Sequence, residues 1–283
     1  MSGQTVILLD GHAPSPADLD WLLVSRALAF GEGVFTSLRV ADGQVVFLED
    51  HLWRLQSGLQ ALRLPLDVID WMLLQQEMQQ LATQQQDGMV KVMLLAGPGG
   101  RGYQRSPDLV WHRFLHARPL TIQSEAYQGI SCWWQPSPGI AAETSSKHLN
   151  RLTQVLASIN CPSGYNEALH HDEKGQITEG IARNVFWFAR GCWHTPALAA
   201  GPLAGVMRRQ ILATLQDEGV EEGFYQLQDL LDAEEVLLCN SLQGIWPVTE
   251  LHGTAGCLAR WRVGPQTRRL MADFHPSLGL PLI

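Results

Sequence analysis

Hydrophobic and polar positions along the first 118 residues predict strands and helices in turn. Two short apolar runs, 34–40 and 44–48, flank an Asp-Gly pair, which is typical of a β-hairpin. Leucines recur on one side of residues 49–64, so this segment predicts a helix, and the proline that follows would end it. The strongly apolar run 89–96 predicts a further strand.

Two polar segments complete this first half. The Gln-rich stretch 75–86 predicts a helix with a solvated face, because Leu74, Met78 and Leu81 recur at helical spacing and the glutamines fall outside that stripe. After the predicted strand, residues 97–102 read Gly-Pro-Gly-Gly-Arg-Gly. Such a segment predicts a surface loop whose backbone is flexible.

From Pro119 the composition shifts toward Pro and Ser, and more segments of the second half have the pattern of β-strands. Turn residues separate its apolar runs, which predicts antiparallel strands with two intervening helices. The predicted strands are 167–171, 176–178, 184–189, 192–195 and 235–239, and the predicted helices are 148–159 and 206–218. We therefore expect an α+β protein with a small N-terminal α/β domain, 1–118, and a larger β-rich C-terminal domain, 119–283.

Composition and charge narrow the class of protein. Of the 283 residues, 46% are hydrophobic and 17% are charged, which is typical of a globular chain rather than a disordered one. The formal net charge of −8 argues against a nucleic-acid partner, because neutralising phosphates needs a basic face. No apolar stretch approaches the roughly 20 residues that span a bilayer, so we expect no membrane partner.

The cysteines and histidines suggest neither disulfides nor a metal centre. There are five cysteines with no Cys-x-x-Cys pair, and the N-terminus lacks the features of a signal peptide. We expect a cytoplasmic protein with reduced thiols and no bound metal. The histidine candidates for a metal hydrolase fit surface or structural positions better, and they are His112, His116, His170 and His171.

Two residues have the chemistry of a cofactor site. Lys147 lies between an extended segment and a predicted helix; it is either an ordinary surface charge or an amine that forms a Schiff base. Glu179 lies between apolar strands, where a carboxylate needs a partner. A primary amine and an acid facing a pyridine nitrogen are the two protein groups that pyridoxal 5′-phosphate requires.

The phosphate of such a cofactor needs backbone donors or a cation. Gly205 precedes a predicted helix beginning with Val206 and Met207, whose free N–H groups can receive a dianion. Asn240 and Ser241 follow a predicted strand and offer amide and hydroxyl donors, and a positive charge is available from Arg54.

Together these motifs resemble the fold-type IV pyridoxal-phosphate enzymes, a family of branched-chain aminotransferases, D-amino-acid aminotransferases and aminodeoxychorismate lyases. The motifs keep the family order from Arg26 to Pro247. Within the family, three segments look most like the lyases, and they are 99–103, 147–152 and 239–242. The motifs that carry the wider resemblance are residues 26–35, 51–55, 147–152, 179 with 184–186, and 205–208.

The resemblance implies roles for particular residues. Lys147 would be the Schiff-base lysine, and Glu179 would face the pyridinium nitrogen. Arg54, Val206, Met207 and Ser241 would hold the phosphate, Asn240 would lie near cofactor and substrate, and Arg101 and Tyr103 would belong to a loop, in the family often from the neighbouring subunit, that recognises the substrate carboxylate. Arg183 departs from the lyases, which have small residues there; we expect it to face solvent, the alternative being a second carboxylate contact.

The resemblance to the lyases implies the conversion of 4-amino-4-deoxychorismate into 4-aminobenzoate and pyruvate, a step of folate biosynthesis, by a homodimer. One alternative is an aminotransferase of the same fold that acts on D-amino acids or branched-chain amino acids, since Lys147 and Glu179 serve both reactions. Another is a non-catalytic binding module, which the presence of both residues disfavours. Three tryptophans, Trp133, Trp134 and Trp246, are expected in the core rather than in the pocket.

Overall fold

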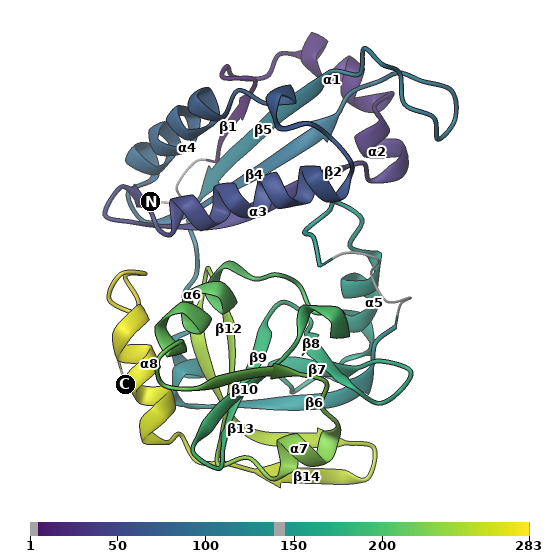
Figure 1. The fold of residues 1–283 in the computed structure, drawn as a ribbon. Coiled ribbons are helices and arrows are strands. Elements are labelled where there is room, and N and C mark those ends of the chain that lie inside the picture. The colour runs from purple at the N-terminus through teal and green to yellow at the C-terminus, as the bar shows by residue number, and fades with distance from the viewer. Residues whose placement is uncertain (1–4, 139–144, 283) are drawn as a thin grey trace. The chain divides into compact units, whose positions relative to one another are not determined.

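The computed structural model describes residues 5–138 and 145–282, which form two compact units (Figure 1). Unit 1 takes the chain up to Thr121 together with Ser146–Asn150, and unit 2 takes Ile122–Ser145 and the chain from Arg151 onward. The short segment that carries Lys147 therefore belongs to unit 1, although it follows the first strand of unit 2 in the sequence.

Unit 1 is built on a sheet in which every pair of neighbouring strands is antiparallel. The spatial order is β1-β5-β4-β2-β3, and β2 opposes β4 with Phe35 beside Met93. The predicted hairpin is confirmed, but its second strand is only two residues long. The strands are β1 (Val6–Leu9), β2 (Gly33–Ala41), β3 (Gln44–Val45), β4 (Gly88–Ala96) and β5 (Trp111–Arg118).

Two long helices pack against this sheet and bury the leucine stripes that the sequence pattern predicted. Leu55 and Leu59 of α3 and Leu74 and Leu81 of α4 are fully buried in the same apolar core. Burial of each such side chain contributes about 2 kcal/mol, so these stripes fix both helices on the sheet. The helical elements of unit 1 are α1 (Pro16–Leu23), α2 (Arg26–Phe30), α3 (Leu48–Ala61), η1 (Leu66–Val68) and α4 (Trp71–Gln85).

The described residues of unit 2 form a nine-stranded mixed sheet in the order β11-β10-β9-β12-β13-β6-β7-β8, with β14 paired to β13. Three pairs are parallel, namely β6 with β7, β6 with β13, and β10 with β11. The strands are β6 (Ile130–Pro136), β7 (Glu167–His171), β8 (Ile177–Gly180), β9 (Asn184–Ala189), β10 (Cys192–Pro196), β11 (Val220–Gly223), β12 (Glu235–Asn240), β13 (Gly244–Gly253) and β14 (Gly256–Arg260).

Short helices accompany the sheet of unit 2 (Figure 1). They are η2 (Ser124–Gln128), α5 (Leu152–Asn160), η3 (Leu198–Ala200), α6 (Val206–Leu215), α7 (Leu227–Leu231) and α8 (Pro265–Phe274). Within residues 5–138 and 145–282 there is no helix with the length and apolar character that a membrane crossing requires.

The helix predicted for 148–159 begins four residues later, and this part of the prediction was wrong. The N–H of Leu149 donates to the carbonyl oxygen of Gly33 over 2.9 Å, and His148 forms a bridge with Val34. Backbone pairing of residues 147–149 with β2 therefore replaces the helical hydrogen bonds. A local pattern cannot show this pairing, since its partner lies more than a hundred residues away.

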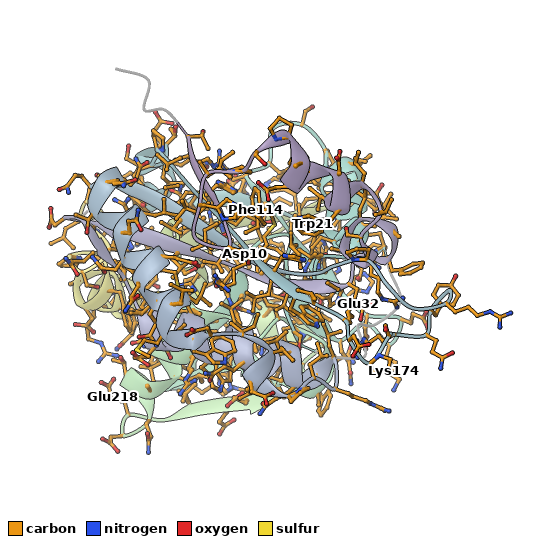
Figure 2. All side chains as sticks on the ribbon, turned by 90° about the horizontal axis from the view of Figure 1, so that it is seen from above. Asp10, Trp21, Glu32, Phe114, Lys174 and Glu218 are labelled. Atoms are coloured by element: carbon orange, nitrogen blue, oxygen red, sulfur yellow. The ribbon has the colours of Figure 1, made fainter. Side chains whose placement is uncertain are left out.

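His112 has a structural position, as expected. Its ring stacks on Trp21 with centroids 3.8 Å apart, and its Nδ1 lies 2.7 Å from Oδ2 of Asp10 (Figure 2 labels Asp10 and Trp21). Burial raises the pKa of Asp10, but the hydrogen bonds from His112 and from the N–H of Arg113 outweigh it and lower that pKa. These half-buried polar contacts join the end of β1 to β5.

Candidate active site

Lys147 is held in unit 1 by the edge of β2. Its carbonyl oxygen accepts a 2.9 Å hydrogen bond from the N–H of Phe35, and its Nζ lies 4.8 Å from the centroid of the Phe35 ring. The backbone is thus fixed on a rigid strand, and the amine lies over an aromatic face, which favours a defined side-chain position. This placement suits a residue that must present its amine to a ligand.

Arg54 lies near Lys147 within unit 1, in a buried polar cluster between α3 and β2. Its Nη2 donates to Oγ1 of Thr36, which lies 2.6 Å from Nδ1 of His51. Burial, then the positive charges of Arg54 and Lys147, hold the pKa of His51 well below its usual value. The ring therefore stays neutral at neutral pH and adds no third positive charge.

The sequence reasoning assigned no role to Thr36 or His51. One indication was present in the sequence. His51 precedes Arg54 by three residues on a helix, so the two side chains lie on the same helix face. Thr36 and His51 both contact Nη2 of Arg54 and so help to orient its guanidinium.

Glu179 lies at the end of β8 in unit 2, with its carboxylate fixed by two donors. Its Oε2 accepts from the N–H of Leu203 over 2.8 Å and from Nδ2 of Asn184 over 3.4 Å. Asn184 also donates to the carbonyl oxygen of Leu203 over 2.9 Å. Burial lowers the pKa of Arg151 and the charge of Glu179 raises it, which shows that this cation is close to Glu179. Asn184 thus joins the carboxylate to the loop before α6, a role the sequence reasoning did not assign.

The N-terminus of α6 opens directly after that loop. Gly205 is its N-cap residue and provides no side-chain cap for the amides of the first turn. A Cβ atom at Gly205 would lie 2.0 Å from Oδ1 of Asn184, so the site requires glycine. Val206 and Met207, whose N–H groups belong to this turn, are buried.

Asn240 and Ser241 lie at the end of β12, beside the β8–β9 turn. The strand register pairs Cys239 with Asn184, and Nδ2 of Asn240 donates to the carbonyl oxygen of Ala182 over 3.3 Å. The Asn240 Oδ1 accepts from Leu242 and Gln243, which fixes the turn that carries the buried Ser241. The end of β8, which carries Glu179, and the end of β12, next to Ser241, therefore both lie beside the β8–β9 turn of unit 2.

Arg101 and Tyr103 lie in unit 1, at the tip of the loop between β4 and β5. Both are exposed, and the Tyr103 side chain is 87% exposed. The expected surface loop is confirmed, and it presents both side chains to solvent.

Arg183 contradicts the expectation that it faces solvent. Only 6% of the residue is exposed, and its guanidinium carbon lies 3.2 Å from the ring centroid of Trp246. Burial lowers the pKa of Arg183 to about 10, while nearby Glu167 raises it. A local sequence pattern cannot show the burial of Arg183, because the partner side chains come from β7 and β13. Trp246 is buried as expected, whereas Trp133 and Trp134 are only half-buried.

A cavity of about 280 Å³ elsewhere in unit 2 contains none of the predicted site residues. Its charged groups already have partners, since His194 lies 3.6 Å from Glu221 and Arg190 lies 3.7 Å from Asp232. We therefore do not assign it to the candidate active site.

Each unit contains groups that suit one part of pyridoxal 5′-phosphate. The first turn of α6 has no side-chain cap, and the hydroxyl of Ser241 lies at the end of β12. Such groups suit a phosphate dianion. Glu179 offers a fixed carboxylate for a protonated ring nitrogen, and Lys147 offers a primary amine for an aldehyde. The individual roles stay predictions.

Comparisons with known proteins agree with this chemistry. The family model described as amino-transferase class IV matches residues 33–251. An aminodeoxychorismate lyase of Vibrio harveyi is 30% identical over 89% of this chain and 95% of its own length.

Solved structures show the same architecture. The 4-amino-4-deoxychorismate lyase of Pseudomonas aeruginosa has a TM-score of 0.83 and 30% identity, covering 96% of this chain and 98% of its own. The branched-chain aminotransferase of Escherichia coli has a TM-score of 0.82 at 22% identity, covering 95% and 93% respectively, and shows the fold alone. The expected two-domain α+β fold of the fold-type IV enzymes is confirmed. The chain belongs to the class IV aminotransferase family.

Proposed function

We propose that this protein is an aminodeoxychorismate lyase, which converts 4-amino-4-deoxychorismate into 4-aminobenzoate and pyruvate with pyridoxal 5′-phosphate as cofactor. The observation that carries this proposal is the 30% identity to a lyase of that name over nearly the full length of both chains. The chemistry of the groups within each unit supports it, because each part of the cofactor has a matching group in the chain.

In unit 2, we assign cofactor binding to Glu179 and to the N-terminus of α6. The carboxylate of Glu179, oriented by Leu203 and Asn184, holds a proton on the pyridine nitrogen. The amides of Val206 and Met207 and the hydroxyl of Ser241 bind the phosphate. When bound, the cofactor supplies a cationic ring that takes up the electron pair of a breaking C–H bond.

In unit 1, Lys147 supplies the amine for the cofactor aldehyde, and Arg54 adds a positive charge for the phosphate. Once the substrate amine has replaced it at the aldehyde, the Nζ of Lys147 is a free base and accepts the proton from C4 of the substrate. It returns a proton to the leaving enolpyruvyl group, whose loss makes the ring aromatic. Because one amine removes the proton from C4 and returns a proton to the leaving group, the proton stays close to the reacting atoms.

We assign recognition of the substrate carboxylates to Arg101 and Tyr103, with Asn240 near the cofactor and the substrate. The substrate is an anion and the chain has a net charge of −8, so binding requires local positive charge. The exposed position of Arg101 supports this assignment.

The test is an assay of 4-aminobenzoate formation from 4-amino-4-deoxychorismate by wild type and Lys147→Ala, with exposed Lys174→Ala as the control. We expect wild type and the control to be active, and Lys147→Ala to lose at least about a hundredfold in rate. Borohydride reduction followed by peptide mapping should label Lys147. A label on another lysine would reject the assigned amine.

The second candidate is an aminotransferase, which the structural likeness to the branched-chain aminotransferase favours at the level of fold. The same protein should be supplied with D-alanine or a branched-chain amino acid and a keto acid. Fast amino transfer without 4-aminobenzoate would reject the lyase.

We also propose that the protein is a cytoplasmic homodimer. Helix α5 supports the dimer, because four apolar side chains recur on an exposed face at helical spacing: Leu152, Val155, Leu156 and Ile159. An exposed apolar stripe of this kind is typical of an interface. The five cysteines, all free thiols, support a reducing compartment.

A further inference from the structure

The loop between β4 and β5 contains three glycines in backbone conformations that other residues rarely adopt. Gly99, Gly100 and Gly102 adopt positive φ angles of 138°, 89° and 56°. A tight turn closes the tip, where the N–H of Arg101 donates to the carbonyl oxygen of Gln104 over 3.1 Å. Three glycines within four residues make the ordering of this loop entropically costly, so its conformation depends on outside contacts.

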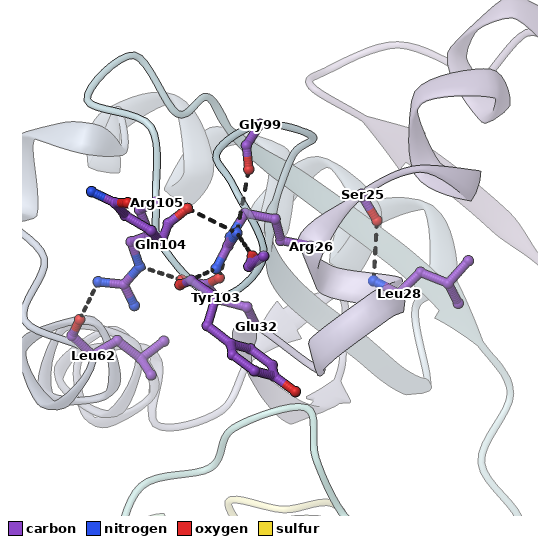
Figure 3. Close-up of polar contacts among 10 residues, drawn as sticks. Ser25, Arg26, Leu28, Glu32, Leu62, Gly99, Tyr103, Gln104 and Arg105 are labelled. Carbon is purple, nitrogen blue, oxygen red and sulfur yellow. Dashed lines mark hydrogen bonds and ion pairs between the residues drawn. The ribbon is translucent and has the colours of Figure 1, made fainter.

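Arg26 supplies those contacts from the start of α2 (Figure 3). Its Nη2 donates to the carbonyl oxygen of Tyr103 over 2.9 Å, and its Nη1 donates to that of Gly102 over 2.9 Å. Longer bonds of 3.3 and 3.4 Å from Nη1 reach Gly99 and Gln104. One side chain therefore contacts four carbonyl groups of the loop.

Glu32 holds the Arg26 side chain in place. Its Oε2 lies 2.6 Å from Nε of Arg26, and its Oε1 accepts from Nε of Arg105. Nη1 of Arg105 donates to the carbonyl oxygen of Leu62 over 2.7 Å. Since Arg26 is only 5% exposed, the carboxylate compensates the cost of burying its charge. A lysine could replace the charge but not the planar fork of donors.

The anchored loop leaves Arg101 and Tyr103 pointing outward. The Tyr103 ring lies 5.2 Å from the Phe30 ring, over which the Arg26 guanidinium lies at 5.0 Å. The Arg26 guanidinium contacts the loop backbone, Glu32 and Phe30. Arg101 is the exposed cation at the tip.

We infer that Arg26 and Glu32 are positioning residues for substrate recognition: they shape the 99–104 loop so that Arg101 can bind a carboxylate of the substrate. This inference rests on the proposed function, because it takes Arg101 as the group that contacts the substrate. Arg26 acts through the loop and does not touch the reacting atoms.

The test compares Arg26→Lys with Arg63→Lys, the same change at an exposed arginine of unit 1, in the holoenzyme. For Arg26→Lys we expect the KM for 4-amino-4-deoxychorismate to rise about tenfold with a smaller change in kcat. Amide hydrogen exchange of residues 99–104 should become faster, while the visible absorbance of the bound cofactor stays unchanged. Glu32→Gln should act in the same direction, and it provides the test if Arg26→Lys does not fold.

A double variant tests whether Arg26 acts through Arg101. Because the two residues serve one contact, Arg26→Lys combined with Arg101→Gln should raise KM no further than Arg101→Gln alone. The inference fails if Arg26→Lys keeps the KM of Arg63→Lys, if the loop exchanges faster without any change in KM, or if the effects of the two changes add.

A failure of the proposed function would be recognised separately. A wild type that transfers amino groups from an amino acid and forms no 4-aminobenzoate rejects the lyase. The KM for that amino acid, which also carries a carboxylate, then tests Arg26 in the same variants.

Discussion

The Nε atom of Arg183 lies 3.6 Å from Oε2 of Glu167, and both side chains are almost fully buried. The other carboxylate oxygen of Glu167 accepts from the N–H of Ile181 over 2.8 Å. Glu167 therefore fixes the β8–β9 turn at two points. Glu179 and Asn184 lie at the two ends of this turn, so the pair holds in place the turn that joins the two residues of the proposed ring-nitrogen site.

Glu167→Gln should destabilise the protein by about 3 kcal/mol. The amide oxygen of glutamine can still accept from Ile181, so the change removes the charge and leaves the buried Arg183 without a counterion. The free energy of unfolding in denaturant measures the effect. Glu250→Gln is the matched control, since its partner Arg260 is exposed, and it should cost less than about 1 kcal/mol. Equal losses in the two variants would show that the buried pair contributes no more than an exposed one.

Gly205→Ala should weaken cofactor binding. The added Cβ would lie 2.0 Å from Oδ1 of Asn184, so either the asparagine or the start of α6 must move. We expect about tenfold weaker binding of pyridoxal 5′-phosphate and a stability loss of about 2 kcal/mol. Absorbance titration with the cofactor measures the first, and denaturant unfolding of the apoprotein measures the second.

Gly253→Ala is the control, because its new Cβ would meet only the Leu258 side chain, at 3.1 Å. It should leave cofactor affinity unchanged. If Gly205→Ala also left the cofactor affinity unchanged, the start of α6 would not be part of the phosphate site.

Charged substitutions on α5 should separate the proposed dimer. Val155→Glu with Ile159→Lys puts charges on the exposed apolar face, where Ile159 is 71% exposed. Light scattering should give twice 31.4 kDa for wild type and a mass near one chain for the variant. Met72→Glu, at an exposed apolar position of α4, is the control and should stay dimeric. A double variant of full dimer mass would place the interface elsewhere.

The sequence predicted those elements whose stability comes from local pattern. Strands β7 and β9 have the predicted bounds, and the leucine stripes of α3 and α4 are buried. Turn residues and periodicity determine these features within a dozen positions, so reading them needs no knowledge of distant contacts.

Features that depend on distant partners were not predictable in this way. The segment around Lys147 pairs with β2, and Arg183 is buried by partners on β7 and β13. Strand β13 was not predicted, since Pro247 interrupts its pattern. For the site, motifs indicated Lys147, Glu179 and the start of α6, whereas Asn184 received its role only when its bonds to Glu179 and Leu203 were known.

Acid should destabilise the protein through the buried His170. Burial, then the charge of neighbouring His171, lowers its pKa from 6.5 to about 4, and its Nε2 lies 3.1 Å from the Gln135 amide. Between pH 6.5 and 4 the unfolded chain binds a proton that folded His170 does not bind, so stability is lost as the pH falls through this window. A shift of this size corresponds to about 3 kcal/mol at pH 4.

His170→Asn should flatten this pH dependence, whereas His12→Asn, at an exposed histidine, should leave the wild-type slope unchanged. Denaturant unfolding at half-unit steps from pH 7 to pH 4 gives the slopes. Because asparagine has no titratable group, the free energy of unfolding of His170→Asn should approach that of wild type at pH 4, although it is lower at pH 7. If the free energies of unfolding of wild type and His170→Asn fell in parallel with pH, His170 would titrate normally in the folded state.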